Sequence, residues 1–537
     1  MHSRPEAISF RGAALYADTI RSGQDAAALD AAVTETAERL AAGDDVGARR
    51  EHAAALRAAG SYRKALAVLT VGLRSRPGEP GLLTDRGHTY LNVRAVPAAV
   101  RDLENATRLD PESFDAWYHF GLARWFERDD AAAAEAFGRA ASVTPSASSR
   151  LAAQVWHYTS LRRSGRRDEA RALLDRIDPD VELEGKNENY RLRARLYRGA
   201  ATEADVLASQ VPGTKAEGSL GFGVGIMHLI DGDAMRARSH FEVAASSSFW
   251  PAFGAAAADY ELGVLDGVTP PRPEAQSVIG VPLYAEFALS PEEVERREAE
   301  LEVARSALAS APDDTDLARA YAKLLASGLA RYRDAEAFLD ERIERRPDDP
   351  ALLCDRGHYR INTRRFEDAL VDLTAAAERA PRSHDVWYHL GLARWMLGDI
   401  EAAVDALLRA RATCDLDSHR IAYSDWLYLG LRRLGRSGEA EDVIAPLHAS
   451  MKTTGNNHLY LQRILFYKGE ISEDELVERS SGGGLAHASL YGLGCWHLAA
   501  GDSAAARDIF LRIVEHGTAW GAFAHIGAEV ELYRGLL

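Results

Sequence analysis

The chain has 537 residues, which is too long for one compact core and predicts several domains or an extended repeat array. Hydrophobic residues make up 47% of the sequence and charged residues 27%, a balance that excludes global disorder. A formal net charge of −16 repels phosphate backbones and anionic lipid headgroups. We therefore expect neither nucleic acid nor a membrane among its partners.

The N-terminal segment, residues 1–45, is predicted to be helical and carries no apolar signal core. No run of about 18 apolar residues occurs anywhere in the chain, so we expect a cytoplasmic protein. A high Ala content and few lysines favour a bacterial source with a GC-rich genome. Cys354, Cys414 and Cys495 form no CxxC pair and are interpreted as buried fillers, so no metal and no cofactor is expected.

From residue 46 onward the sequence contains a short repeat, whose period is the spacing between Gly87 and Gly121. The residues that recur are Gly87, Tyr90, Ala99, Leu103, Ala106 and Pro111, followed by Trp117, Phe120, Gly121, Ala133, Phe137, Ala140 and Pro145. This pattern resembles the tetratricopeptide repeat (TPR). The resemblance implies an all-α, right-handed solenoid of helical hairpins whose first helices line a concave face.

A long repeat, whose period is the spacing between Leu82 and Leu352, relates two halves of the chain. LLTDRGHTYLNVR, from Leu82, corresponds to LLCDRGHYRINTR, from Leu352, and DAWYHFGLARW, from Asp115, corresponds to DVWYHLGLARW, from Asp385. We interpret this as a tandem duplication that gives module 1 (residues 46–263) and module 2 (293–537). Residues 264–292 lack periodicity and are predicted to be a linker.

Polar and aromatic residues that both copies keep on the first helices of the hairpins are candidates for a ligand groove, because packing alone does not require them. The candidate pairs are Asp85 and Asp355, His88 and His358, Asn92 and Asn362, Asp115 and Asp385, His119 and His389, Trp125 and Trp395, Trp156 and Trp426, Arg162 and Arg432, Arg163 and Arg433, Asn187 and Asn457, Tyr190 and Tyr460, and Arg193 and Arg463. Their spacing places them on one helical face, so we expect an aromatic and basic groove in each module.

Structural roles stay open beside the ligand role. For His88 and His119 a hydrogen bond inside the fold is the favoured role, and Arg162 and Arg163 suit a solvated helix end as well as a ligand. Trp117 and its counterpart Trp387 occupy the aromatic seam position of the repeat, where we expect core packing.

No recorded catalytic signature is present: we find no P-loop, no HExxH, no GxSxG and no paired CxxC. We assign no catalytic residue, although whether the chain is an enzyme stays open. An enzyme here would use acid–base and anion-binding groups drawn from His88, His119, Asp85, Asp115, Arg162 and Arg163.

Three classes of function fit the sequence. The first is a non-catalytic scaffold or adaptor that holds a protein or peptide segment in each groove, with two grooves raising the effective concentration for the second binding event. The second is a small-molecule-binding protein or enzyme that uses the His, Asp, Arg and Trp side chains of the groove. The third is a structural solenoid that forms homo-oligomers through its apolar ends.

Overall fold

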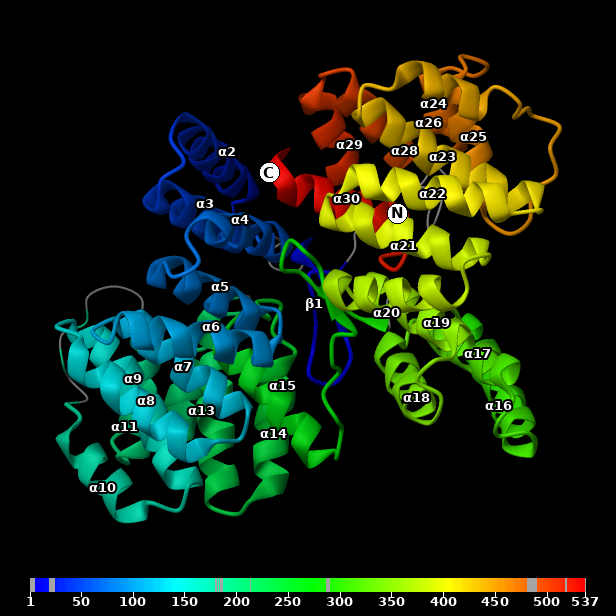
Figure 1. Cartoon of the computed structure of the whole chain (residues 1–537). Coiled ribbons are helices and arrows are strands. Elements are labelled where there is room, and N and C mark those ends of the chain that lie inside the picture. The colour runs from blue at the N-terminus through cyan, green and yellow to red at the C-terminus, as the bar shows by residue number, and fades with distance from the viewer. Residues whose placement is uncertain are drawn as a thin grey trace. The chain divides into compact units, whose positions relative to one another are not determined.

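The computed structural model describes residues 5–18, 25–178, 181, 183, 187–212, 214–285, 290–480, 490–516 and 519–536. The chain divides into two compact units, Met1–Arg272 (unit 1) and Pro273–Leu537 (unit 2) (Figure 1). The predicted all-α repeat solenoid is confirmed, since helices dominate both units and the strands are limited to two short hairpins among the described residues.

The described elements of unit 1 are β1 (Ala7–Ile8), β2 (Ala14–Leu15), α2 (Ala26–Ala42), α3 (Val46–Ala58), α4 (Tyr62–Ser75), α5 (Pro80–Asn92), α6 (Val96–Leu109), α7 (Phe114–Phe126), α8 (Asp130–Val143), α9 (Ala147–Arg163), α10 (Arg167–Arg176), α11 (Glu188–Tyr197), α12 (Glu203–Ala208), α13 (Lys215–Ile230), α14 (Ala234–Ala245) and α15 (Phe253–Leu265).

The described elements of unit 2 are β3 (Ala275–Gln276), β4 (Pro282–Leu283), α16 (Pro291–Ser310), α17 (Thr315–Lys323), a π-helical turn (Leu324–Gly328), α18 (Tyr332–Arg345), α19 (Pro350–Asn362), α20 (Phe366–Arg379), α21 (His384–Leu397), α22 (Ile400–Thr413), α23 (Asp417–Arg433), α24 (Ser437–Ile444), α25 (Asn457–Tyr467), α26 (Glu473–Arg479), α28 (Leu490–Ala499), α29 (Ser503–His516), α30 (Phe523–Glu531) and a second π-helical turn (Leu532–Leu536).

Consecutive helices pack as antiparallel hairpins, and α5 to α9 lie side by side in unit 1 (Figure 1). The glycine of the repeat lies where the two helices of a hairpin approach most closely. A Cβ atom at Gly87 would lie 2.5 Å from Leu103, and one at Gly357 would lie 2.6 Å from Leu373. Any side chain at these positions would push the hairpin apart, which explains the glycine.

The N-terminal segment differs from the helical prediction. Ala7 pairs with Leu15 and Ile8 with Ala14 in an antiparallel hairpin before α2 begins. Its backbone is held by the last part of the unit, since the Trp250 indole donates to the Tyr16 carbonyl (3.1 Å). These two-residue strands are too short for a periodicity signal in the sequence.

A similar hairpin occupies part of the segment predicted as a linker. Ala275 pairs with Leu283, and the Trp520 indole donates to the Tyr284 carbonyl (3.0 Å). Residues from 273 onward therefore belong to the fold of unit 2. The signal in the sequence is EAISFRGAALYA (6–17) against EAQSVIGVPLYA (274–285), which share seven residues at a spacing two positions shorter than that of the long repeat.

Candidate functional site

The inner face of unit 1 is covered by the unit's own last helix. We use "inner face" for the side of α5, α7 and α9 that carries the predicted groove residues, and for the equivalent side of α19, α21 and α23. The segment that leads into α15 lies on this face: the Asn92 amide donates to the Pro251 carbonyl (3.2 Å), and the Arg94 guanidinium donates to the Trp250 carbonyl (2.8 Å). The predicted concave face is therefore filled from within the chain.

In unit 2 the inner face is covered in the same way by the last helix, α30, and the segment that leads into it. The Asn362 amide donates to the Gly521 carbonyl (2.5 Å), and Arg364 donates to the Trp520 carbonyl (2.9 Å). Arg364 also pairs with Glu529 on α30 through two hydrogen bonds of 2.8 and 3.0 Å. Burial raises the pKa of Glu529, but the Arg364 guanidinium and the His525 imidazole together outweigh burial and bring that pKa to about 2. The carboxylate is thus ionised and fixes α30 to the inner face.

The two predicted histidines lie in contact with each other under the last helix. The rings of His88 and His119 stack with centroids 4.1 Å apart, and both rings contact Phe253 at the start of α15. His358 and His389 stack in the same way, 4.3 Å apart, in unit 2. An aromatic side chain of the protein thus occupies the space beside each histidine pair.

The histidines of unit 1 are held neutral. The His119 Nδ1–H donates to the carbonyl of Asp115 (2.7 Å). Burial lowers the pKa of His88 well below its usual value, and His119 lowers it further. Burial also lowers the pKa of His119, although the Asp115 carboxylate acts in the opposite direction. This pair stabilises packing, which is the structural alternative left open by the sequence.

Of the neighbouring arginines, Arg163 joins the inner face to α15. Its guanidinium donates to Glu261 (2.7 Å) and Asp130 (3.1 Å) and lies over the buried ring of Trp125, 4.3 Å from the centroid. Burial raises the pKa of Glu261, and Arg163 opposes that rise. The equivalent contacts in unit 2 involve Arg433, Glu531 and Trp395.

Of the predicted aspartates, Asp85 and Asp355 form ion pairs within their units, whereas Asp115 is exposed. Asp85 accepts a hydrogen bond from Arg50 (2.6 Å), and Asp355 accepts two from Arg319 (2.8 and 3.1 Å). Each of these carboxylates therefore joins its helix to the preceding hairpin. The Asp115 side chain is exposed.

Asn187 and Tyr190 form hydrogen bonds within the protein. The Asn187 amide donates to the Ser148 carbonyl (3.2 Å), and the Tyr190 hydroxyl bonds to that of Tyr118 (2.8 Å). Asn457 repeats the first contact in unit 2 (3.0 Å). These groups attach α11 and α25 to the preceding repeats.

Arg193 is a fully buried cation that has no carboxylate partner among the described residues. Its guanidinium lies over the rings of Trp156 (5.1 Å), Phe222 (5.3 Å) and Tyr190 (5.6 Å). Among the described residues, neither of its terminal nitrogens has a hydrogen-bond partner. The charge of Arg193 is therefore stabilised by aromatic rings.

Arg463, the counterpart in unit 2, has an ion pair instead. Asp425 accepts two hydrogen bonds from its guanidinium, of which the Nε bond measures 3.0 Å, and the ring of Tyr460 lies 4.7 Å away. Asp425 precedes the buried Trp426, and Val155 stands at the equivalent position of unit 1. The two inner faces thus differ at this buried contact.

Arg162 and Arg432 lie at the edge of the inner face and are partly exposed. Arg162 donates to Asp231 (2.7 Å) and to the Tyr158 hydroxyl (3.0 Å). Arg432 lies over the ring of Tyr428. Of the predicted groove residues, most are taken up by contacts inside their unit, and their ligand role stays a prediction that requires the last helix to move.

The arrangement closest to a catalytic triad is Cys354, His389 and Asp385. The Cys354 Sγ lies 3.9 Å from His389 Nδ1, and an Asp385 oxygen lies 3.5 Å from that same nitrogen. A triad needs the acid and the nucleophile on opposite ring nitrogens. Burial also raises the pKa of the Cys354 thiol well above its usual value, so this group is unsuited to nucleophilic catalysis.

Three groups of side chains bring metal-binding atoms within 4.8 Å of one another in the described part of the chain. They are Glu203, His228 and His240; Cys354, Asp385 and His389; and His384, Cys414 and His419.

Sequence reasoning missed the residues that close the inner face. Arg94, Trp250 and Glu261 are kept in both copies, with identical residues at the equivalent positions of unit 2. Arg94 and Arg364 also hold left-handed backbone conformations with φ of 64°, which non-glycine residues rarely adopt. The retention of these three residues in both copies was the signal available in the sequence.

We use "outer face" for the side of α21 and its neighbouring helices opposite the inner face. On the outer face of unit 2 lies a cavity of about 350 Å³, lined by Trp387, Leu390 and Arg394 of α21 together with residues of α20 and α22. Trp387 is half-buried, and its indole donates to the Pro381 carbonyl (2.9 Å), as Trp117 does in unit 1. Trp117 packs against the edge of the hydrophobic core of unit 1, as expected, whereas Trp387 is half-buried beside the cavity. Trp387 and His389 are two residues apart, which turns them about 200° from each other on the helix.

The family model "TPR_16: Tetratricopeptide repeat" matches residues 84–148 and 354–417. The chain contains tetratricopeptide repeats. Repeats of this kind build protein-interaction scaffolds. No helix of the described residues combines the length and apolarity needed to cross a bilayer.

Among solved structures, the chain is similar to a tetratricopeptide repeat protein from Parabacteroides merdae, with 18% identity, 43% of this chain and 89% of that chain covered, and a TM-score of 0.30. It is also similar to the APC/C hetero-tetramer Cut9–Hcn1 (12% identity, 86% of each chain, TM-score 0.30) and to yeast Tom70 (12% identity, 91% and 95%, TM-score 0.24). No curated protein matches the sequence.

Proposed function

We propose that this chain is a non-catalytic scaffold that binds a protein partner through the outer faces of two similar modules. The observation that carries the proposal is the contrast between the two sides of α21. On the inner side, His389 packs against Phe523 of the unit's own last helix. On the other side, Trp387 lines a cavity with the Arg409 guanidinium 4.6 Å from its ring centroid.

Trp and Arg side chains at a partly exposed cavity are the residue types that contribute most to protein–protein affinity. The alternative surface is the inner groove, where a peptide would have to displace α15 or α30. That displacement would expose fully buried rings such as Trp125 and Trp395, at a cost of several kcal/mol. The outer face requires no such change.

We also infer that the two modules arose by tandem duplication, because equivalent side chains of the two copies form equivalent contacts. Two similar outer faces can engage two segments of one partner, which raises the effective concentration for the second contact. A bacterial source and a cytoplasmic location stay predictions. We do not favour a small-molecule enzyme, since the histidine pairs are covered by Phe253 and Phe523.

The test is affinity capture from a lysate of the source cells, followed by mass spectrometry. We expect a partner that is recovered with wild-type protein and lost with the double variant W117A/W387A. The matched control is R162A/R432A, which changes partly exposed residues at the edge of the inner face. Loss of the partner with the arginine variant alone, while both variants keep the circular dichroism of wild type, would move the site to the inner face.

A further inference from the structure

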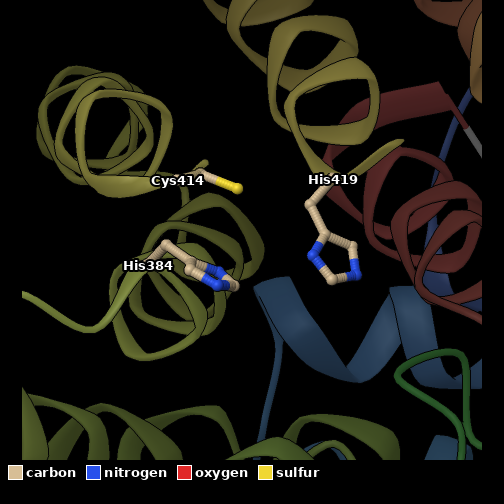
Figure 2. Close-up of side chains that lie close together, drawn as sticks. All are labelled: His384, Cys414 and His419. Atoms are coloured by element: carbon tan, nitrogen blue, oxygen red, sulfur yellow. The ribbon is translucent and has the colours of Figure 1, made fainter. Parts of the chain in front are cut away.

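Two histidines and a cysteine meet at one end of the repeat in unit 2. His384 is the first residue of α21, Cys414 directly follows α22, and His419 lies in the first turn of α23. Because α21 and α23 are successive first helices of hairpins, their N-terminal ends lie near each other, and the connection after α22 runs between them. Figure 2 shows all three side chains pointing toward the space between these elements.

The distances suit a single small ion. The metal-binding atoms of His384, Cys414 and His419 all lie within 4.8 Å of one another. Ligand atoms of a tetrahedral zinc ion are separated by about 3.3 to 3.8 Å, given Zn–N and Zn–S bonds of about 2.0 and 2.3 Å. We expect rotation of the side chains to close that difference when the ion binds.

The donor set has the chemistry of a zinc site. One thiolate and two imidazoles are the soft and borderline ligands that zinc prefers over oxygen-only sites. Three protein ligands leave the fourth tetrahedral position for a solvent molecule. Cys414 is fully buried, while both histidines are partly exposed, so the position is reachable from solvent.

Hydrogen bonding around the cluster supports ligation. The Nδ1 atom of His419 is buried and has no hydrogen-bond partner among the described residues. His384 Nδ1 bonds to the hydroxyl of Tyr423 (2.8 Å), the kind of outer contact that orients a ligating imidazole and fixes its tautomer.

Unit 1 builds the same helix ends without these ligands. Its residues at the positions equivalent to His384, Cys414 and His419 are Phe114, Thr144 and Ser149, and Ala153 replaces Tyr423. The repeat itself therefore needs none of the three ligand side chains. Their joint presence in unit 2, with a supporting hydroxyl, indicates a site that belongs to this unit alone.

We propose that His384, Cys414 and His419 bind one Zn²⁺ ion in unit 2. Binding replaces the proton of the Cys414 thiol, which is released to solvent, and fixes the start of α23 to the start of α21. None of the three ligand residues lines the Trp387 cavity, so we expect the ion to stabilise the fold of unit 2 without occupying the partner-binding surface proposed above.

The first experiment uses the full-length chain, treated with a chelator and titrated with CoCl₂. Cobalt bound by a cysteine thiolate gives a charge-transfer band in the near ultraviolet, and a four-coordinate site gives strong d–d bands in the visible. We expect both at one cobalt per chain, and we expect ZnCl₂ to remove them because zinc displaces cobalt. The absence of a thiolate band would overturn the proposal. Cobalt bound at Glu203, His228 and His240 gives no such band.

Variants assign the band to these residues. C414S should abolish it, whereas C354S and C495S, which change the other two buried cysteines, should keep it. A band that persists in C414S would contradict the assignment.

H419A changes a partly exposed residue and should weaken the cobalt and zinc affinities even if C414S folds poorly. Y423F should weaken the same affinities about tenfold. Unchanged affinity in H419A would also overturn the proposal. ZnCl₂ should raise the Tm of wild type and leave that of H419A nearly unchanged.

Discussion

Arg193 in unit 1 and Arg463 in unit 2 stand at equivalent positions, yet their buried charges are stabilised differently. Arg193 lies among the rings of Trp156, Tyr190 and Phe222 and has no carboxylate partner in the described residues. Arg463 has one nearby ring and a bidentate ion pair with Asp425. Duplicated modules can therefore keep a buried arginine while aromatic rings stabilise its charge in one module and a carboxylate does so in the other.

The largest expected effect comes from breaking the ion pair of unit 2. D425V gives unit 2 the residue of unit 1 and leaves Arg463 buried without its carboxylate. We expect the free energy of unfolding to fall by about 3–5 kcal/mol, as measured by urea denaturation.

The matched control is V155D, which offers Arg193 the carboxylate that Arg463 has. We expect a change within about 1 kcal/mol, because the gain of an ion pair offsets the burial of a second charge. If V155D lowers the free energy of unfolding as much as D425V does, the environments of Arg193 and Arg463 are not interchangeable.

A second comparison concerns the ion pairs of the last helices. Arg163 contacts both Glu261 and Asp130, whereas Ile400 replaces Asp130 in unit 2 and Arg433 depends on Glu531. We therefore expect E531Q to lower the free energy of unfolding by about 3 kcal/mol and E261Q by about half as much. Thermal denaturation of both variants provides the measurement, and equal losses would argue against this difference between the units.

A further expected effect is a pH dependence shared by both units. Burial lowers the pKa of His88 and His358 well below the unfolded value, so the unfolded chain binds the proton first as the pH falls. The neutral rings contribute their full stabilisation above about pH 6.5. Below that pH the free energy of unfolding falls by up to about 1.4 kcal/mol per pH unit for each histidine.

Urea denaturation between pH 7.5 and 5 checks this prediction. H88Q and H358Q should each reduce the slope of unfolding free energy against pH. His119, Arg57 and Lys215 also lower the pKa of His88. We therefore change His88 and His358 themselves and leave these neighbouring groups in place. A slope unchanged in both variants would contradict the burial of these rings.

Much of the fold followed from the sequence, because it depends on local spacing. Gly87 and Leu103 mark the crossing of two helices, and the recurrence of this pair as Gly121 and Phe137 predicted the hairpins. The position of α15 on the inner face did not follow, since it depends on long-range contacts such as that of Asn92 with the backbone before α15. Retention in two copies singled out these polar and aromatic residues as ligand candidates, but it could not distinguish ligand contacts from contacts with the protein's own last helix.

The same reasoning explains why His384, Cys414 and His419 were not singled out. A search for residues kept in both copies passes over groups that only one copy has. The three residues are also separated by 29 and four intervening positions, a spacing that matches no familiar zinc motif. Only the packing of α21 against the start of α23 brings them together.

The most direct test of the account is native-state hydrogen exchange of the last helices, measured by mass spectrometry. If α15 and α30 are part of the core of their units, the backbone amides of Phe253–Leu265 and Phe523–Glu531 should be protected as strongly as those of α7 and α21. Fast exchange in the last helices while α7 and α21 stay protected would show that the inner faces open readily. That result would contradict the closure of the inner faces by α15 and α30 and would favour the predicted groove as the partner site.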